Sequence, residues 1–162
     1  MSAATPKKRT PSANTIATNR KARRDFHVLE SIEVGIELRG AEVKSIRARD
    51  VSLDESYAKA EGREVVLHGM HVAPYRHSRV EELEPRRPRR LLLHRREILK
   101  LTGQVNQKGL TLIPLKLYLK HGRIKVELGI CKGKDSGDKR ETLRRKTAER
   151  EVAREISERR KR

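Results

Sequence analysis

Residues 109–134 carry the longest apolar alternation in the chain, and this stretch constrains the fold more than any other. Every second residue in 113–119 and in 124–130 is apolar, and His121 and Gly122 lie between the two runs. A period of two is that of a strand with one buried face, and a short glycine-containing link is typical of a hairpin. We therefore expect an antiparallel hairpin that buries the odd-numbered residues of the first run and the even-numbered residues of the second.

The opposite face of this hairpin is polar. It carries Lys116, Tyr118, Arg123, Lys125 and Glu127, so it is expected to meet solvent or a ligand. Cys131 falls on the same outward phase.

Shorter segments indicate the remaining elements. Residues 25–38 alternate with the period of a strand, and residues 57–72 contain two strand segments separated by a Glu-Gly turn. Apolar residues three apart in 41–50 predict a short helix, and residues 91–102 predict another that stops at Gly103. These segments predict a mainly β chain: a small antiparallel β-barrel like the oligonucleotide-binding (OB) fold, with two or three short helices.

The ends of the chain differ from this middle in composition. Only 35% of residues are hydrophobic and 38% are charged, so the apolar residues cannot fill a core that spans the whole chain. We expect a disordered segment at 1–18, a barrel at 19–134 and a basic tail at 135–162 that is disordered or helical. Three prolines and many charges in 74–90 predict an exposed, mobile loop with an arginine cluster.

The formal net charge of +18 indicates a polyanionic partner, most simply a nucleic acid. A membrane surface is a weaker alternative because no long apolar segment or signal peptide occurs. Aromatic residues make up 2% of the chain, which argues against a reader that stacks bases on paired rings. RNA binding through charge, shape and backbone contacts is the expectation.

Catalytic and cofactor motifs are absent from the sequence. No P-loop, GxSxG, HExxH or paired-carboxylate pattern occurs, so we expect no enzyme activity, no cofactor and no metal site. The single cysteine excludes an intrachain disulfide. The basic residues of 20–24 predict a phosphate-binding arm, and Lys44 and Arg47 on the outer side of the first helix are either RNA contacts or solvated charges of a packing helix.

Six segments, in order along the chain, closely resemble the SsrA-binding protein (small protein B) family. They are NRKAR (19–23), GIELRGAEVKSIRA (35–48), SYAKAEGREVVLHGMHVAPY (56–75), RPRRLLLHRREI (87–98), the hairpin 109–134 and DKRETLRRK (138–146).

The resemblance implies a bacterial cytoplasmic protein of trans-translation, the rescue of ribosomes stalled on messages that lack a stop codon. Its OB-like barrel would bind the tRNA-like domain of transfer-messenger RNA, and its tail would enter the empty decoding centre and message channel of the small subunit. Alanyl-tRNA synthetase and the elongation factor that carries aminoacyl-tRNA would act on the same complex. We expect a monomer.

The resemblance also implies site residues. Glu33, Leu92 and His94 match RNA-binding positions of the family, with Glu33 accepting hydrogen bonds from base amino groups or a ribose hydroxyl. Phosphate contacts are expected at Arg20, Lys21, Lys44, Lys132 and Lys134. The decoding-centre role is expected of Gly137, Asp138, Lys139, Arg140 and Ile156. Gly137 departs from the family, because relatives often carry a ring there that can stack on a ribosomal base.

Two alternatives remain open at this point. A basic ribosomal protein that binds ribosomal RNA would have much the same composition. A nuclease or RNA-modifying enzyme is a further alternative, although no acid/base or metal constellation supports it.

Overall fold

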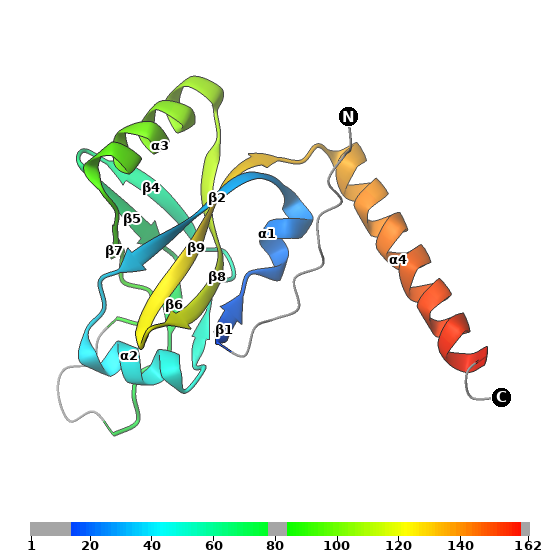
Figure 1. Ribbon diagram of the computed structural model, residues 1–162, viewed down its shortest axis with the longest axis horizontal. Coiled ribbons are helices and arrows are strands. Elements are labelled where there is room, and N and C mark those ends of the chain that lie inside the picture. The colour runs from blue at the N-terminus through cyan, green and yellow to red at the C-terminus, as the bar shows by residue number, and fades with distance from the viewer. Residues whose placement is uncertain (1–13, 78–83, 160–162) are drawn as a thin grey trace.

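The computed structural model describes residues 14–77 and 84–159. Figure 1 shows a β-rich body from which one long helix projects. The elements in chain order are β1 (Thr15–Thr18), α1 (Arg20–Asp25), β2 (Phe26–Ile36), α2 (Gly40–Arg47), β3 (Val51–Ser52), β4 (Tyr57–Glu61), β5 (Glu64–His68), β6 (His71–Val72), β7 (Arg89–Leu92), α3 (Arg95–Lys108), β8 (Thr111–Lys120), β9 (Arg123–Gly133) and α4 (Ser136–Arg159).

Seven strands form one antiparallel sheet in the order β1-β8-β4-β5-β7-β2-β9, and β8 also pairs with β9. That extra pairing closes six of the strands into a ring, while β3 and β6 pair separately. The predicted mainly β, antiparallel fold with short helices is confirmed, with six strands in the ring where an OB barrel has five.

Strand β1 lies within the segment that the sequence predicted to be disordered. Residues 15–18 pair with β8, with Thr15 opposite Tyr118, so the ordered body begins before residue 19. The prediction was wrong for these four residues because a β8 edge supplies backbone partners that composition cannot reveal. Residues 1–13 of that predicted segment lie outside the described part of the chain.

The hairpin of β8 and β9 forms as predicted, but its first half faces the other way. The pairing register of β8 shifts between Pro114 and Lys116, which makes Leu115 a bulge residue. As a result Leu112 lies in the main core, together with Leu117 beyond the bulge. Ile113 and Leu115 instead pack in a second, smaller cluster on the other side of the sheet. An extra residue in a strand reverses the faces of everything on one side of it.

The second cluster corrects the expectation for Cys131. Its side chain is fully buried rather than outward-facing, because Ala22 of α1 and Phe26 cover this side of the hairpin. Asn19 caps α1 by accepting a hydrogen bond from the Ala22 amide at 3.0 Å. Burial raises the pKa of the Cys131 thiol from 9.0 to about 11.

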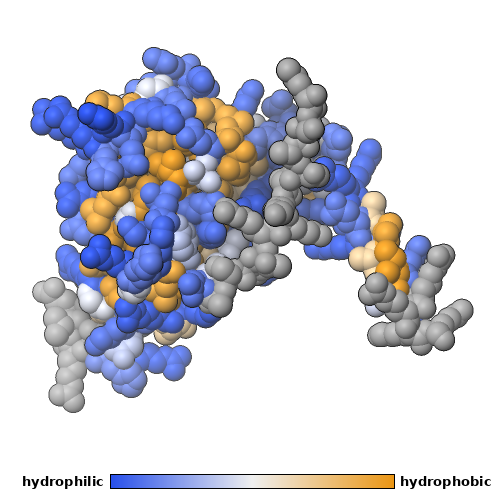
Figure 2. All heavy atoms as spheres, viewed as in Figure 1, coloured by the Kyte–Doolittle hydropathy of each residue, from blue (hydrophilic) through white to orange (hydrophobic). Residues whose placement is uncertain are grey.

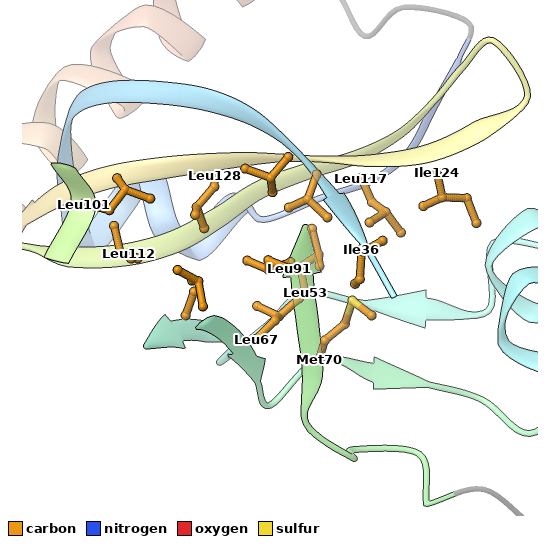
Figure 3. Close-up of a cluster of buried hydrophobic side chains, with 14 of the residues drawn as sticks. Ile36, Leu53, Leu67, Met70, Leu91, Leu101, Leu112, Leu117, Ile124 and Leu128 are labelled. Carbon is orange, nitrogen blue, oxygen red and sulfur yellow. The ribbon is translucent and has the colours of Figure 1, made fainter. Parts of the chain in front are cut away.

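The main core fills the ring. Strand β2 contributes Val34 and Ile36, β9 contributes the even-numbered residues of 124–130, and α3 covers one end with Leu101 (Figures 1 and 3). Strand β2 has its own register shift around Leu29, which is 59% exposed.

Helix α3 begins and ends later than predicted. Leu91 and Leu92 belong to strand β7, where Leu91 is buried and pairs with both β2 and β5. The helix starts after His94, whose backbone N–H donates to the Glu97 carboxylate at 2.8 Å, and it continues through Gly103. It ends at Gly109, which has the left-handed φ of 61° that favours glycine.

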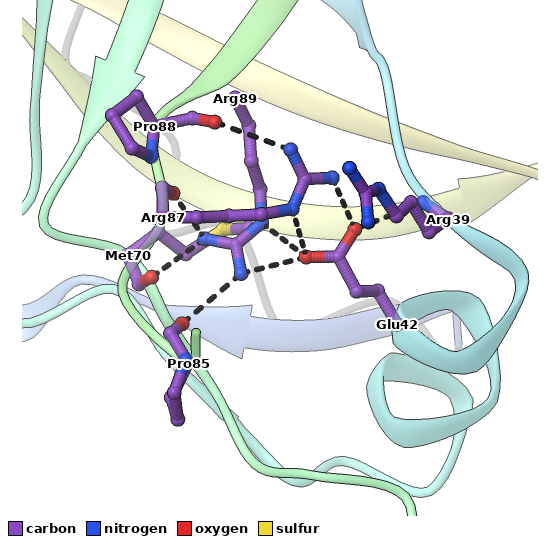
Figure 4. A network of polar contacts seen from close by, with 7 residues as sticks. All are labelled: Arg39, Glu42, Met70, Pro85, Arg87, Pro88 and Arg89. Atoms are coloured by element: carbon purple, nitrogen blue, oxygen red, sulfur yellow. Dashed lines mark hydrogen bonds and ion pairs between the residues drawn. The ribbon is translucent and has the colours of Figure 1, made fainter. Parts of the chain in front are cut away.

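The arginine-rich segment that leads into and begins β7 is more fixed than the predicted exposed loop. Arg89 is fully buried, and Arg87 and Arg89 both bond to Glu42 of α2 (Figure 4). Residues 78–83 of the predicted loop lie outside the described residues.

The predicted tail is helical. Helix α4 runs over 24 residues, and from residue 143 to 158 every side chain is exposed. Figure 2 shows it as largely hydrophilic, with an apolar patch toward its far end. Within the described parts of the chain, none of the helices is long and apolar enough to cross a membrane.

Candidate RNA-binding surface

Two of the residues predicted from the family resemblance lie together on the outer face of the sheet. Gly35 of β2 pairs with Leu92 of β7, and Glu33 precedes Gly35 by two residues on the same face. Diagonal neighbours on one face of an antiparallel pair lie about 7–8 Å apart. Leu92 is 50% exposed, and a Cβ at Gly35 would lie 3.1 Å from the Leu92 Cβ. The sheet therefore presents a carboxylate and an apolar side chain side by side.

Glu33 is held by two side chains from the end of β8. The Tyr118 hydroxyl donates to Glu33 Oε2 at 2.5 Å. The Lys120 ammonium donates to both carboxylate oxygens, at 2.9 and 3.0 Å. The Tyr118 hydrogen bond, followed by that from Lys120, lowers the pKa of Glu33 below its usual value. Glu33 is thus an ionised group with a fixed orientation.

A second polar group lies next to it across the strands. Glu127 of β9 is opposite Glu33 and forms an ion pair with Lys116 at 3.0 Å. The Ser31 hydroxyl donates to the same carboxylate at 3.1 Å. The Lys116 ammonium lies 5.1 Å from the centre of the Tyr118 ring. Three strands therefore supply one continuous polar layer.

A shallow pocket of about 290 Å³ adjoins this layer. Apolar side chains from β2, α2, β7 and β9 line it together with two cations, and the lining residues are Gly35, Ile36, Leu38, Val43, Leu92, Gly122, Arg123, Ile124 and Lys125. Arg47 of α2 lies beside it, with its guanidinium donating to the Gly122 carbonyl at 3.2 Å. Lys44 is exposed, with its ammonium 5.2 Å from the centre of the Tyr75 ring.

His94 is a further predicted RNA-binding residue, and it lies close to Leu92 in the chain. It follows β7 by two residues and caps α3, and its side chain is exposed. Glu33 and Leu92 lie on the paired strands β2 and β7, His94 follows β7 in the chain, and Arg47 lies beside the adjoining pocket. We call this surface the β2–β7 face.

The remaining predicted phosphate contacts lie elsewhere. His27, at the start of β2, pairs with Lys132, about 20 Å along the strand from Glu33 at 3.3 Å per residue. Lys134 donates to the Arg23 carbonyl at 3.2 Å, which places it against α1. The structure thus divides the predicted RNA contacts into two groups.

Helix α1 supplies the rest of this second group. Arg20 and Lys21 line a groove of about 530 Å³ together with Arg49. Lys21 also forms an ion pair with Glu55 at 3.5 Å. We call α1 and the adjoining end of β9 the α1 face.

The tail residues begin beside the α1 face. The Asp138 carboxylate lies at hydrogen-bond distance from His27 Nε2, at 3.1 Å, and Lys134 donates to the Thr142 hydroxyl at 3.2 Å. Gly137 lies in the first turn of α4, where an added Cβ would meet no other described atom within 4 Å. Lys139 and Arg140 are exposed in the next positions, and Ile156 lies near the far end of the helix with 52% exposure.

Tyr118 and Lys120 are the residues that the family resemblance did not assign to the site. The alternation of the hairpin placed Tyr118 on the polar face, and this was the sequence feature that could have indicated its role. Lys120 could not be assigned in the same way because it ends the strand. In the described residues, no group of three His, Cys, Asp or Glu side chains is arranged to hold a metal ion.

Comparison with known sequences places this chain among proteins of one kind. The family model for the SmpB protein matches residues 16–158. The SsrA-binding protein of Caldicellulosiruptor saccharolyticus is 52% identical over 143 residues, which cover 88% of this chain and 90% of that protein. The SsrA-binding protein of Clostridium botulinum strain Hall is 51% identical over 147 residues, covering 91% and 94%.

A solved structure agrees with these matches. A chain from the structure described as "tmRNA-SmpB: a journey to the center of the bacterial ribosome" is 46% identical to this one. The two superpose with a TM-score of 0.64, over 79% of this chain and 94% of the other.

Proposed function

This chain belongs to the SmpB protein family, and on that basis we propose that it binds transfer-messenger RNA and acts with it on the ribosome in trans-translation. One observation carries the proposal: the family match spans residues 16–158, so it includes both the barrel and almost the whole tail helix. The net charge of +18 supports an RNA partner. The protein is then a binding factor rather than an enzyme.

The two faces suggest two tasks within this function. The β2–β7 face combines a carboxylate acceptor at Glu33, an apolar side chain at Leu92 and the ring nitrogens of His94. Such a set suits the tRNA-like domain, because it can contact bases and ribose hydroxyls as well as phosphates. Arg47 adds positive charge at its edge, and Lys44 is an exposed cation of the same helix.

The α1 face and the tail suit the ribosome. Lys132 and Lys134 lead directly into α4, so contacts made by the α1 face continue into Gly137, Asp138, Lys139 and Arg140. The exposed helix beyond them carries Ile156 and many basic side chains. We propose that this tail occupies the empty decoding centre and the message channel.

The proposal extends to the setting and to the other partners. The protein would act in the bacterial cytoplasm as a monomer. Alanyl-tRNA synthetase and the elongation factor that carries aminoacyl-tRNA would act on its complex with transfer-messenger RNA. Support for these points comes from family membership alone.

Binding to two RNAs tests the proposal. The purified protein is titrated against the tRNA-like domain of its own transfer-messenger RNA and against a structured RNA of equal size, across a salt series. Both should bind at low salt because of the charge. A preference for the tRNA-like domain that persists at physiological salt supports the proposal, and equal loss of both RNAs contradicts it.

Two variants test the division between barrel and tail. Leu92→Ala should weaken binding to the tRNA-like domain. A chain that ends at residue 137 should keep most of that binding but fail to tag nascent chains in a reconstituted translation reaction. A truncated chain with no RNA affinity would contradict this division.

A ribosomal protein is the alternative that the charge still favours. It would be present in equal number with ribosomes after a high-salt wash, whereas a rescue factor would be present on few of them.

A further inference from the structure

The carboxylate of Glu33 is almost fully occupied by its own protein. An ionised carboxylate has about four acceptor positions. Three are filled, by one hydrogen bond from the Tyr118 hydroxyl and two from the Lys120 ammonium. Yet the side chains of Glu33 and Lys120 remain 37% and 48% exposed, so an RNA could reach both. An RNA donor can therefore use Glu33 fully only if another donor leaves.

Lys120 is the donor that can leave. Its ammonium is a compact charge on a flexible stem and swings readily to a nearby anion. An ion pair this exposed is weak in water, so exchange is easy. The Tyr118 ring, by contrast, lies within 5.1 Å of the Lys116 ammonium and is fixed between strand neighbours. Tyr118 therefore keeps the carboxylate oriented while Lys120 moves.

We propose that Glu33, Tyr118 and Lys120 form an exchange site that decides which RNAs the β2–β7 face accepts. In the unbound protein Glu33 withholds Lys120 from phosphates. An RNA that presents a base amino group or a ribose hydroxyl to Glu33 replaces Lys120 there, and the released ammonium binds a phosphate of the same RNA. An RNA whose shape does not bring such a donor to Glu33 leaves Lys120 paired and gains no contact from it. This inference rests on the proposed function, since the accepted RNA is the tRNA-like domain.

The exchange has consequences opposite to those of simple electrostatics. Every surface lysine would normally strengthen binding to any RNA alike. Here Lys120 contributes to the accepted RNA alone. Removing the negative charge of Glu33 frees Lys120 for every RNA. The variant should therefore gain affinity for RNAs other than the tRNA-like domain and lose its preference for the tRNA-like domain.

Salt-dependent binding measures the number of phosphate contacts directly. Each one contributes about 0.7–0.9 to the slope of log affinity against log salt. Lys120→Met should reduce this slope by that amount for the tRNA-like domain and leave it unchanged for a size-matched structured RNA. Glu33→Gln should increase the slope for the size-matched structured RNA by the same amount. Adding Lys120→Met to Glu33→Gln should cancel that increase.

Matched controls separate the exchange from a change in net charge. Glu61→Gln removes the same charge as Glu33→Gln, but its partner at 3.0 Å is His68 rather than a lysine. It should not raise the salt slope for the size-matched structured RNA by the amount that one phosphate contact contributes. Lys59→Met removes an exposed lysine from strand β4 and should change both RNAs equally. Thermal unfolding of each variant confirms that the fold is retained.

Tyr118→Phe tests the positioning role. It should lower the ratio of the affinity for the tRNA-like domain to that for the size-matched structured RNA. The salt slope for the size-matched RNA should not change, since Lys120 stays with Glu33. An equal affinity loss for both RNAs would remove Tyr118 from the exchange site.

The other outcomes are equally decisive. If Lys120→Met reduced the slope equally for both RNAs, or for neither, Lys120 would be an ordinary surface cation and the exchange would be refuted. If the wild-type protein showed no preference between the RNAs, the proposed function itself would fail, which is a different result.

Discussion

The Arg89 guanidinium has no exposed surface and lies 2.8 Å from the Glu42 carboxylate, an ion pair that ties strand β7 to helix α2. Arg89 also donates to the carbonyls of Met70 and Pro85, at 2.8 and 3.0 Å (Figure 4). Arg87 donates to Glu42 as well, at 2.9 Å from its Nε. These bonds fix the segment that leads into Leu92, so a buried polar network supports one edge of the β2–β7 face.

Breaking this network from one side should destabilise the protein strongly. Glu42→Gln leaves the Arg89 charge buried without its counter-ion, which costs about 3–5 kcal/mol for a buried pair. Urea unfolding followed by circular dichroism measures the loss. Glu37→Gln is the matched control, because it breaks an exposed pair with Arg90 and should cost far less. Equal losses in the two variants would mean that the buried network contributes little.

The same network makes stability depend on pH. Burial alone would raise the pKa of Glu42, but the hydrogen bonds from Arg87 and the Arg39 backbone and the charge of Arg89 hold it below its ordinary 4.5. A depressed pKa in the folded state contributes stability above 4.5 that is lost as the pH falls further. The unfolding free energy of the wild type should therefore fall on acidification below about pH 4.5. Glu42→Gln should remove part of that dependence, and an unchanged profile would contradict the assignment.

Gly62 and Gly69 have similar backbone conformations but different surroundings, so together they distinguish backbone strain from steric collision. Gly62 and Gly69 have φ values of 63° and 77°, in the left-handed region. An added Cβ at Gly62 meets no other described atom within 4 Å, whereas at Gly69 it would lie 2.8 Å from the Glu55 carbonyl oxygen. Gly62→Ala should therefore cost about 1–2 kcal/mol of backbone strain. Gly69→Ala should cost about 1–3 kcal/mol more, because backbone must move. Thermal unfolding of both variants gives the comparison, and similar losses would refute the collision.

The long alternations were sufficient to predict the β fold. The period of two in β9 put Ile124 and Val126 in the core, where they are found. The same rule failed for Ile113 because a single bulge at Leu115 reverses the face, and a bulge leaves no mark in an alternation of apolar residues.

The arginine-rich sequence at the start of β7 did not show which arginine is buried. Charged residues are nearly always exposed, so Arg89 was expected in an exposed cluster. Its burial depends on Glu42, which lies 47 residues away in sequence, and local patterns do not report such a contact.

The family resemblance indicates individual residues of the proposed site but not their arrangement. The family resemblance indicated Glu33 and Leu92, and the β2–β7 pairing brings them together. It did not indicate Tyr118 and Lys120, whose contacts with Glu33 depend on how far the side chains reach across β9.

Cys131 should resist thiol reagents in the folded protein. Its side chain is fully buried and its pKa is raised to about 11, so little reactive thiolate forms near neutral pH. Labelling by a maleimide should need unfolding and should accelerate with urea. The raised pKa also means that stability is retained below pH 9 and is lost as the pH rises toward 11, since only the unfolded thiol ionises there. Rapid labelling without denaturant would contradict the buried placement.

The tail helix should unfold separately from the barrel. Its first turns are anchored by the pairs His27–Asp138 and Lys134–Thr142. Beyond them it is held by its own hydrogen bonds and by exposed pairs such as Arg154–Glu158. A helix stabilised in this way is marginal in water. Circular dichroism at 222 nm should therefore lose part of its signal gradually on warming, before the cooperative transition of the barrel. A chain that ends at residue 142 should lack the gradual phase and keep the barrel transition. A single transition shared by both chains would mean that α4 is stabilised by the barrel along its length.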